Sequence, residues 1–159
     1  MSDLILIVRT INVEEMGPLL DACRLHWPSA RICVLTSPNR REELRSDGRI
    51  GEVMEYKSPG SGFESPWNDG RTYKAMIVPV RNARGWGYGN VWKSLAPVKA
   101  SSFWVAAWSH NLRSVSLRRM LFRARMERFL GFLCGIGARG LAYLFLLRCR
   151  QRISRKGVS

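Results

Sequence analysis

The sequence predicts an α/β fold, a three-layer sandwich around a mostly parallel five-stranded sheet, followed by a basic and apolar helical tail. Short apolar runs that suit buried parallel strands recur up to residue 107, and segments of helical periodicity separate them. The charge distribution marks the tail. Residues 1–112 contain 14 Lys and Arg against 11 Asp and Glu, whereas residues 113–159 contain 12 against 1. We therefore expect one α/β domain over residues 1–112 and a membrane-associating helical tail over residues 113–159.

The first predicted unit is a strand, a helix and a second strand. Leu4–Val8 and Ile32–Leu35 are continuous apolar runs, as expected for strands that are buried on both faces of a sheet. Asn12 and Glu15 have the spacing of a capping box at the start of the helix, and Pro18 is an alternative start. One apolar stripe of helical period follows, made of Met16, Leu19, Leu20, Cys23 and Trp27.

The second part of the domain continues this alternation. A short helix is expected from Asn39 to Gly48, before a third strand at Val53–Tyr56. The Gly- and Pro-rich stretch Ser58–Thr72 predicts a flexible loop where a crossover helix would normally lie. The remaining elements are expected to be strands at Ala75–Val80 and Phe103–Ala107, with a helix from about Tyr88 to Val98 between them.

The cysteines and the N-terminus indicate the compartment. The four cysteines form no CxxC pair and have no His at the spacing of a zinc site, so we expect no metal and no cofactor. Cys23 and Cys33 lie on apolar faces of predicted elements, which predicts buried free thiols and a reducing, cytoplasmic setting. The N-terminus lacks the basic and apolar regions of a signal peptide.

The tail predicts contact with an anionic membrane surface. In Phe129–Leu147 the only charged residue is Arg139, and the run is flanked by Arg128 and Arg148. As a helix this run is about 28 Å long, but the central arginine and the glycines make spanning marginal. We expect a peripheral or monotopic helix, or a shallow re-entrant turn, at the inner face of the cell membrane. Two alternatives remain: the tail packs on the sheet, or it binds nucleic acid, which is the less favoured partner.

The densest candidate binding segment follows the predicted fourth strand. It leads from the carboxyl edge of the sheet into a helix, where open α/β folds bind ligands. Its glycines permit close approach of the backbone, and its arginines suit phosphate or carboxylate. The expected substrate-binding residues here are Arg81, Asn82, Arg84, Gly85, Gly87, Tyr88, Gly89 and Asn90. The alternative is a glycine turn with solvated arginines.

Two further residues are candidates for acid–base chemistry. Glu15 follows the first strand at the same edge as Arg9, and a carboxylate there could act as a general base on a sugar hydroxyl. The alternative role for Glu15 is that of a helix cap. His110 follows the fifth strand and could shuttle a proton or bind phosphate, or be a surface loop histidine.

The front of the chain resembles the acceptor-side half of GT-B glycosyltransferases of the heptosyltransferase-like family 9. The resemblance is carried by the strand Ile5–Arg9, by Pro18-Leu19-Leu20, and by Trp27–Ile32 running into Val34–Ser37. It implies a Rossmann-like domain with Glu15 in the position of the family's proposed base and Arg9 in the substrate site. It also implies a second, donor-binding domain, for which this chain has no room, so a partner chain would have to supply it.

These observations lead to three functional hypotheses. The first is a glycosyltransferase-like half-domain at the cytoplasmic membrane face, an accessory or subunit in envelope polysaccharide or glycolipid synthesis. Its ligand would be a phosphate-bearing or sugar molecule. The second is a non-enzymatic module that binds an anion or nucleotide, and the third is a nucleic-acid-binding protein.

Overall fold

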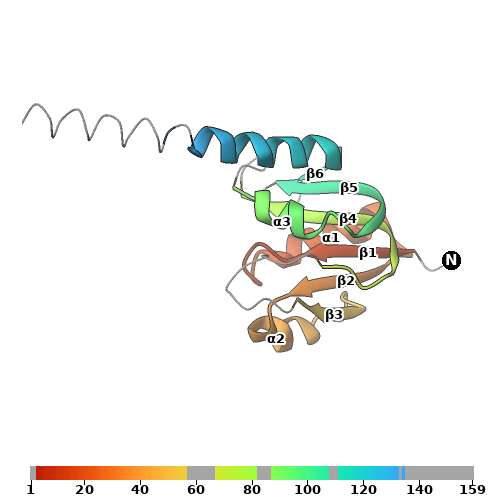
Figure 1. The fold of residues 1–159 in the computed structure, drawn as a ribbon. Helices are drawn as coiled ribbons and strands as arrows, with labels where there is room; N and C mark the ends of the chain where they lie inside the picture. The colour runs from red at the N-terminus through yellow and green to blue at the C-terminus, as the bar shows by residue number, and fades with distance from the viewer. Residues whose placement is uncertain (1–2, 57–66, 82–86, 108–110, 133, 135–159) are drawn as a thin grey trace, which may run out of the picture. The chain divides into compact units, whose positions relative to one another are not determined.

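The computed structural model describes residues 3–56, 67–81, 87–107, 111–132 and 134 of the 159-residue chain. Six strands in these residues form one sheet, in the order β3-β2-β1-β4-β5-β6 (Figure 1). Strands β1 to β5 run parallel, and β6 is antiparallel to β5. The predicted α/β class with a mostly parallel sheet is confirmed. The strands are β1 (Leu4–Val8), β2 (Arg31–Thr36), β3 (Glu52–Glu55), β4 (Thr72–Val80), β5 (Lys99–Ala107) and β6 (Asn111–Val115).

The prediction of five strands was wrong, because β6 adds a sixth at the edge of the sheet. Val115 pairs with Phe103 and Asn111 with Ala107, so this strand lies along the second half of β5. Its sequence contains only two apolar residues, Leu112 and Val115. Short, polar, charged edge strands are common because they discourage pairing with other chains, and for the same reason they carry little apolar signal.

Helix α1 (Met16–His26) has the predicted apolar stripe, and its start lies between the two predicted starts. Met16, Leu19, Leu20 and Cys23 are all at most 1% exposed. The residues before the helix form a turn in which the Glu15 backbone N–H donates to the Asn12 carbonyl, at 3.2 Å. This turn takes up the residues that a helix starting at Asn12 would have used.

The other helices are shorter than predicted. Residues Pro38–Arg40 form a 3-10 turn, so α2 covers only Arg41–Arg45. Helix α3 covers Gly89–Ser94 and does not continue to Val98. Pro97 accounts for the early end, because a proline disfavours helical backbone in the residue before it.

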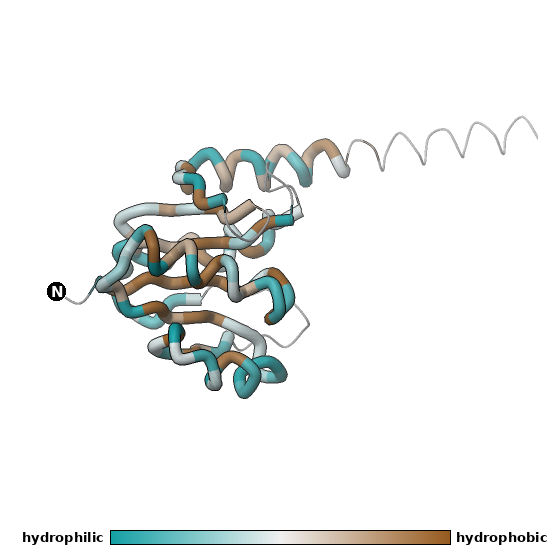
Figure 2. Tube along the Cα trace, turned by 180° about the vertical axis from the view of Figure 1, so that it is seen from behind, coloured by the Kyte–Doolittle hydropathy of each residue, from teal (hydrophilic) through white to brown (hydrophobic). Residues whose placement is uncertain are grey.

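The apolar side chains form one cluster on each face of the sheet. One cluster joins alternate residues of β1 and β2, including Ile5 and Ile32, to the buried face of α1 and to Leu44 of α2. The other joins Leu6 and Cys33 to residues of α3 and of the final helix. Figure 2 shows the apolar residues concentrated along the central strands. The continuous apolar runs of β1 and β2 follow from this burial on both faces.

A final helix begins at residue 117 and continues through residue 132. The chain divides into two compact units, Met1–Ala124 and Arg125–Ser159. Within the first unit, Met120 is 4% and Ala124 is 3% exposed. Most of the predicted membrane run Phe129–Leu147 lies outside the described residues. In the described part of the chain, no helix is both long and apolar enough to cross a membrane.

Candidate functional site

The connections of the sheet place a switch point between β1 and β4. These two strands are neighbours and parallel, but β1 is followed through α1 by β2 on one side, whereas β4 is followed through α3 by β5 on the other. The two connections therefore leave the carboxyl edge in opposite directions. In open α/β sheets the crevice outside such a point is the usual ligand site. The predicted site residues that follow β1 and β4 both lie at this edge (Figure 1).

Arg9 joins the ends of β1 and β2. Its Nε donates to Thr36 Oγ1 at 2.7 Å and its Nη2 to Ser37 Oγ at 3.3 Å. Its Nη1 donates to the Ile11 carbonyl at 2.8 Å. Three hydrogen bonds to neutral oxygens hold this guanidinium in place without neutralising it, so its charge can still act on a ligand.

The sheet brings together Glu15 and Arg81, two predicted site residues that are 66 positions apart in the sequence. Glu15 Oε2 lies 3.9 Å from Arg81 Nη2, and both side chains are partly exposed. The same oxygen accepts a hydrogen bond from the Asn12 N–H at 3.2 Å. This second contact is the backward half of the predicted capping box, so Glu15 closes the turn before α1 as well as meeting Arg81.

Other contacts fix the end of β4 beside the end of β1. The Thr10 hydroxyl donates to the carbonyl of Pro79. The Arg81 N–H donates to the Tyr88 hydroxyl at 3.0 Å, which ties the residue after β4 to the residue before α3. Gly87 has a φ of +86°, a conformation that side chains other than glycine rarely adopt, so this turn requires its glycine.

A polar cavity of about 420 Å³ opens at the same carboxyl edge. Its lining residues come from the segment between β1 and α1 and from the helical turns after β2: Arg9, Asn12, Val13, Glu14, Arg40 and Glu43. Arg40 Nη1 contacts Glu43 Oε1 at 2.6 Å. The lining thus combines two guanidinium groups with two carboxylates. Such a mixture can bind a phosphate through the arginines and hydroxyl groups through the carboxylates.

The structure describes only part of the predicted site. Arg9, Glu15, Arg81 and Tyr88 lie at the carboxyl edge, as predicted. Gly87 precedes α3, which begins with Gly89 and Asn90. The other predicted residues, Asn82, Arg84, Gly85 and His110, lie outside the described residues.

Sequence reasoning missed the contribution of the segment after β2. Arg40 and Glu43 belong to the short helix expected from Asn39 to Gly48, to which no binding role was given, yet both line the cavity. Their position in the sequence could have indicated this role. They follow the second strand, and in a parallel sheet the end of that strand lies beside the end of the first.

The thiols have no evident chemical role. Cys23 and Cys33 are free and buried, as predicted. Burial raises the pKa of Cys23 to about 12 and also raises the pKa of Cys33, so both are neutral thiols at neutral pH. Among the described residues, no group of three or more His, Cys, Asp or Glu side chains is placed to hold a metal ion.

Comparison of this chain with family models, with curated proteins and with solved structures found no match. The resemblance to glycosyltransferases of family 9 therefore stays a prediction.

Proposed function

We propose that this chain is a glycosyltransferase-like half-domain that binds a phosphate-bearing or sugar ligand at the carboxyl edge of its sheet. The observation that carries the proposal is the polar cavity of about 420 Å³ beside the switch point of β1 and β4. A lining of two arginines and two carboxylates suits a sugar phosphate better than an apolar ligand. A three-layer, Rossmann-like arrangement, with helices on both faces of the sheet, leaves this edge open to a ligand.

In this proposal each charged group has a separate role. Arg9 and Arg40, the two arginines of the cavity lining, hold the phosphate, and Glu14 and Glu43 accept hydrogen bonds from sugar hydroxyls. Arg81 holds the Glu15 carboxylate. Glu15 accepts the proton of the acceptor hydroxyl as that oxygen attacks the anomeric carbon of a donor sugar. The donor would be bound by a partner chain, and its phosphate-bearing leaving group would depart with the bonding electrons.

The second candidate is a non-enzymatic module that binds an anion or nucleotide at the same edge. The contacts of Glu15 favour it: one carboxylate oxygen meets both the Asn12 N–H and Arg81. These two contacts give Glu15 a structural role, closing the turn before α1, that needs no proton transfer.

Ligand binding is tested by a thermal scan with sugar phosphates and nucleotides. At about 100 times its dissociation constant, a ligand stabilises the folded chain by roughly 2.7 kcal/mol. Arg40→Ala, which removes a cavity arginine paired with Glu43, should remove most of this shift, whereas Arg45→Ala, which removes an exposed pair with Glu42, should not. If no such ligand shifts the wild type, the proposal fails.

Glu15→Gln separates the two candidates. Gln can still reach back to the Asn12 N–H, so stability should change by less than about 1 kcal/mol. Loss of sugar transfer with ligand binding retained supports the enzyme. Transfer at the wild-type rate would show that Glu15 only closes the turn, and absence of transfer in the wild type, with its partner chain present, leaves the binding module.

A further inference from the structure

A second cavity, of about 370 Å³, lies between the edge of the sheet and the start of the final helix. It is lined by residues of β5, β6 and the helix: Val105, Arg113, Ser114, Val115, Ser116, Arg119, Met120 and Arg123. All of them belong to the compact unit Met1–Ala124. The cavity shares no residue with the one at the carboxyl edge.

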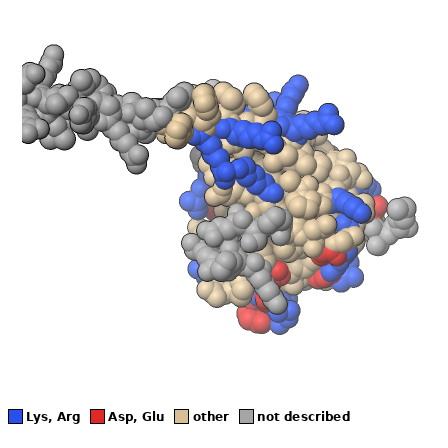
Figure 3. All heavy atoms as spheres, viewed as in Figure 1, with Lys and Arg blue, Asp and Glu red and all other residues tan. Residues whose placement is uncertain are grey.

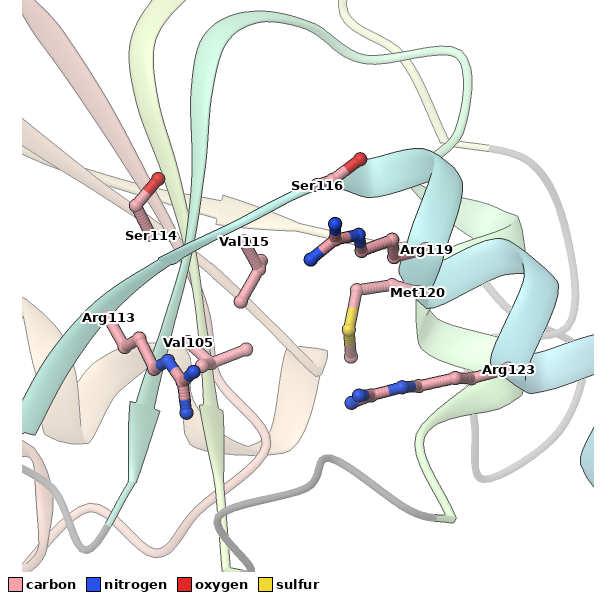
Figure 4. A pocket seen from close by; sticks show the side chains of 8 residues that line it. All are labelled: Val105, Arg113, Ser114, Val115, Ser116, Arg119, Met120 and Arg123. Atoms are coloured by element: carbon pink, nitrogen blue, oxygen red, sulfur yellow. The ribbon is translucent and has the colours of Figure 1, made fainter.

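Three arginines from two elements point toward this cavity (Figure 4). Arg113 lies on β6 opposite Val105 of β5, and neighbouring strands place such partners on one face of the sheet. That face carries Met120 and the other residues that pack under the helix. Arg119 and Arg123 are four residues apart, which places them on one side of the helix. An edge-strand arginine therefore faces two helical arginines.

Two of the arginines at this cavity, Arg113 and Arg119, differ from the basic side chains in the front of the domain. There, basic side chains form ion pairs with carboxylates, for example Arg71 with Glu52 and Arg49 with Asp47. In the described part of the chain, Arg113 and Arg119 contact no carboxylate. On the face drawn in Figure 3, Lys and Arg gather near the final helix, whereas Asp and Glu lie elsewhere. Adjacent guanidinium groups repel one another, and an anion bound between them would relieve that repulsion.

The floor of the cavity is apolar. Val105 and Met120 are 5% and 4% exposed, and Val115 is partly buried beside them. Arginines at the rim and apolar side chains beneath them match a ligand that has both a phosphate and an apolar part. Guanidinium groups bind phosphate through paired hydrogen bonds, and the floor would remove apolar surface from water.

We propose that this cavity is a binding site for a phosphate group, held by Arg113 and Arg119 with Arg123 at the rim, and carried on an apolar body that contacts Val115 and Met120. The phosphate could belong to a lipid headgroup or to a small soluble molecule. This site is separate from the proposed sugar-phosphate site and does not depend on it.

The test measures binding to the full-length chain by titration calorimetry. Three probes are compared: inorganic phosphate, a short-chain phosphatidic acid below its micelle concentration, and the matching short-chain phosphatidylcholine. We expect the phosphatidic acid to bind more tightly than inorganic phosphate. The phosphatidylcholine should bind much more weakly, because its phosphodiester carries one negative charge and its choline is cationic. Equal affinity for the first two would show that the apolar body makes no contact with the floor, and would overturn that part of the proposal.

The decisive variant is Arg113→Ala with Arg119→Ala. Each lost charged hydrogen bond should weaken binding about tenfold, so the double variant should bind about a hundredfold more weakly. The control, Arg118→Ala with Arg125→Ala, removes the same charge from exposed positions that do not line the cavity and should change affinity less than about threefold. Melting temperatures without ligand should be equal, which excludes misfolding as the cause.

Arg40→Ala distinguishes this site from the cavity at the carboxyl edge, and it should leave the binding of phosphatidic acid unchanged. The proposal is overturned if neither phosphate probe binds, or if the double variant binds as tightly as wild type. It is also overturned if the control pair loses as much affinity as the double variant. In each of these cases Arg113 would only protect the edge strand against pairing with other chains.

Discussion

At the scale of single residues, a group of charged contacts lies where the segment before β4 meets β3. Arg71 donates to both carboxylate oxygens of Glu52, at 2.9 and 2.8 Å, and Arg31 lies 3.5 Å from the same carboxylate. The Tyr73 hydroxyl donates to Asp69 Oδ2 at 2.5 Å. These contacts join three strands near one end of the sheet, away from both proposed ligand sites. They therefore affect stability without touching a ligand.

Glu52→Gln should make the free energy of unfolding less dependent on pH between pH 7 and pH 3. The hydrogen bonds from Arg71 lower the pKa of Glu52 below its usual 4.5. A carboxyl group with a lowered pKa in the folded state stabilises the fold at pH values above its usual pKa. This stabilisation is lost as the pH falls through the folded-state pKa. Urea unfolding at pH 7 should therefore show a loss of about 1 kcal/mol in the variant, after allowance for screening by water.

At about pH 3 the stabilities of the variant and the wild type should approach each other. The matched control is Glu42→Gln, since Glu42 also pairs with an arginine but its side chain is 81% exposed. That change should cost less than about 0.5 kcal/mol at any pH. A constant difference between Glu52→Gln and wild type from pH 7 to pH 3 would contradict the role given to the ion pair.

At the scale of elements, the start of the final helix is part of the folded domain. Met120 is 4% exposed and packs with Trp92 and Val105, whereas Phe122, two residues along, is 64% exposed. Met120→Ala should lower the free energy of unfolding by about 2–3 kcal/mol, because it removes buried apolar volume. Phe122→Ala should change it by less than about 0.5 kcal/mol. Equal effects in chemical denaturation would show that this helix does not pack on the sheet.

The sequence predicted those strands whose burial gives a clear pattern. β1 and the four central residues of β2 are apolar because both of their faces are covered, so the predicted ranges were nearly correct. β4 and β5 were predicted three and four residues too short, since Thr72 and Lys99 begin polar segments that are held in the sheet by pairing with each other. Nothing in a polar segment of sequence reveals its partner strand, and β6 was missed for the same reason.

The sequence predicted at which edge of the sheet the candidate site lies, but not which residues meet there. Parallel strands bring their carboxyl ends together, so Arg9, Glu15 and Arg81 were correctly expected at one end of the sheet. The Glu15–Arg81 contact and the cavity beside Arg40 depend on strand order and on the short turn after β2. The site of three arginines was hidden in the sequence, because its residues appeared to be part of a uniformly basic tail.

At the scale of the whole molecule, the excess of positive charge in residues 113–159 predicts binding to an anionic membrane. Full-length protein should sediment with vesicles that contain anionic lipid, and binding should weaken with salt, since charges are screened over about 8 Å at physiological ionic strength. A chain that ends at Arg128 keeps the compact unit Met1–Ala124 and its three-arginine cavity but lacks Phe129–Leu147. It should bind much more weakly.

Vesicles of neutral lipid are the control, and neither chain should sediment with them. Equal binding of the two chains to anionic vesicles would show that the apolar run makes no contribution. Binding to neutral vesicles that is insensitive to salt would show that the basic residues are not needed.

The most direct test of the central claim is amide hydrogen exchange of the full-length chain with and without a saturating sugar phosphate. If the ligand binds in the cavity at the carboxyl edge, exchange should slow in the segment from Arg9 to Glu15 and around Arg40. The amino ends of the same strands should be unchanged. Protection confined to β6 and the final helix, or no protection anywhere, would contradict a ligand site at the carboxyl edge.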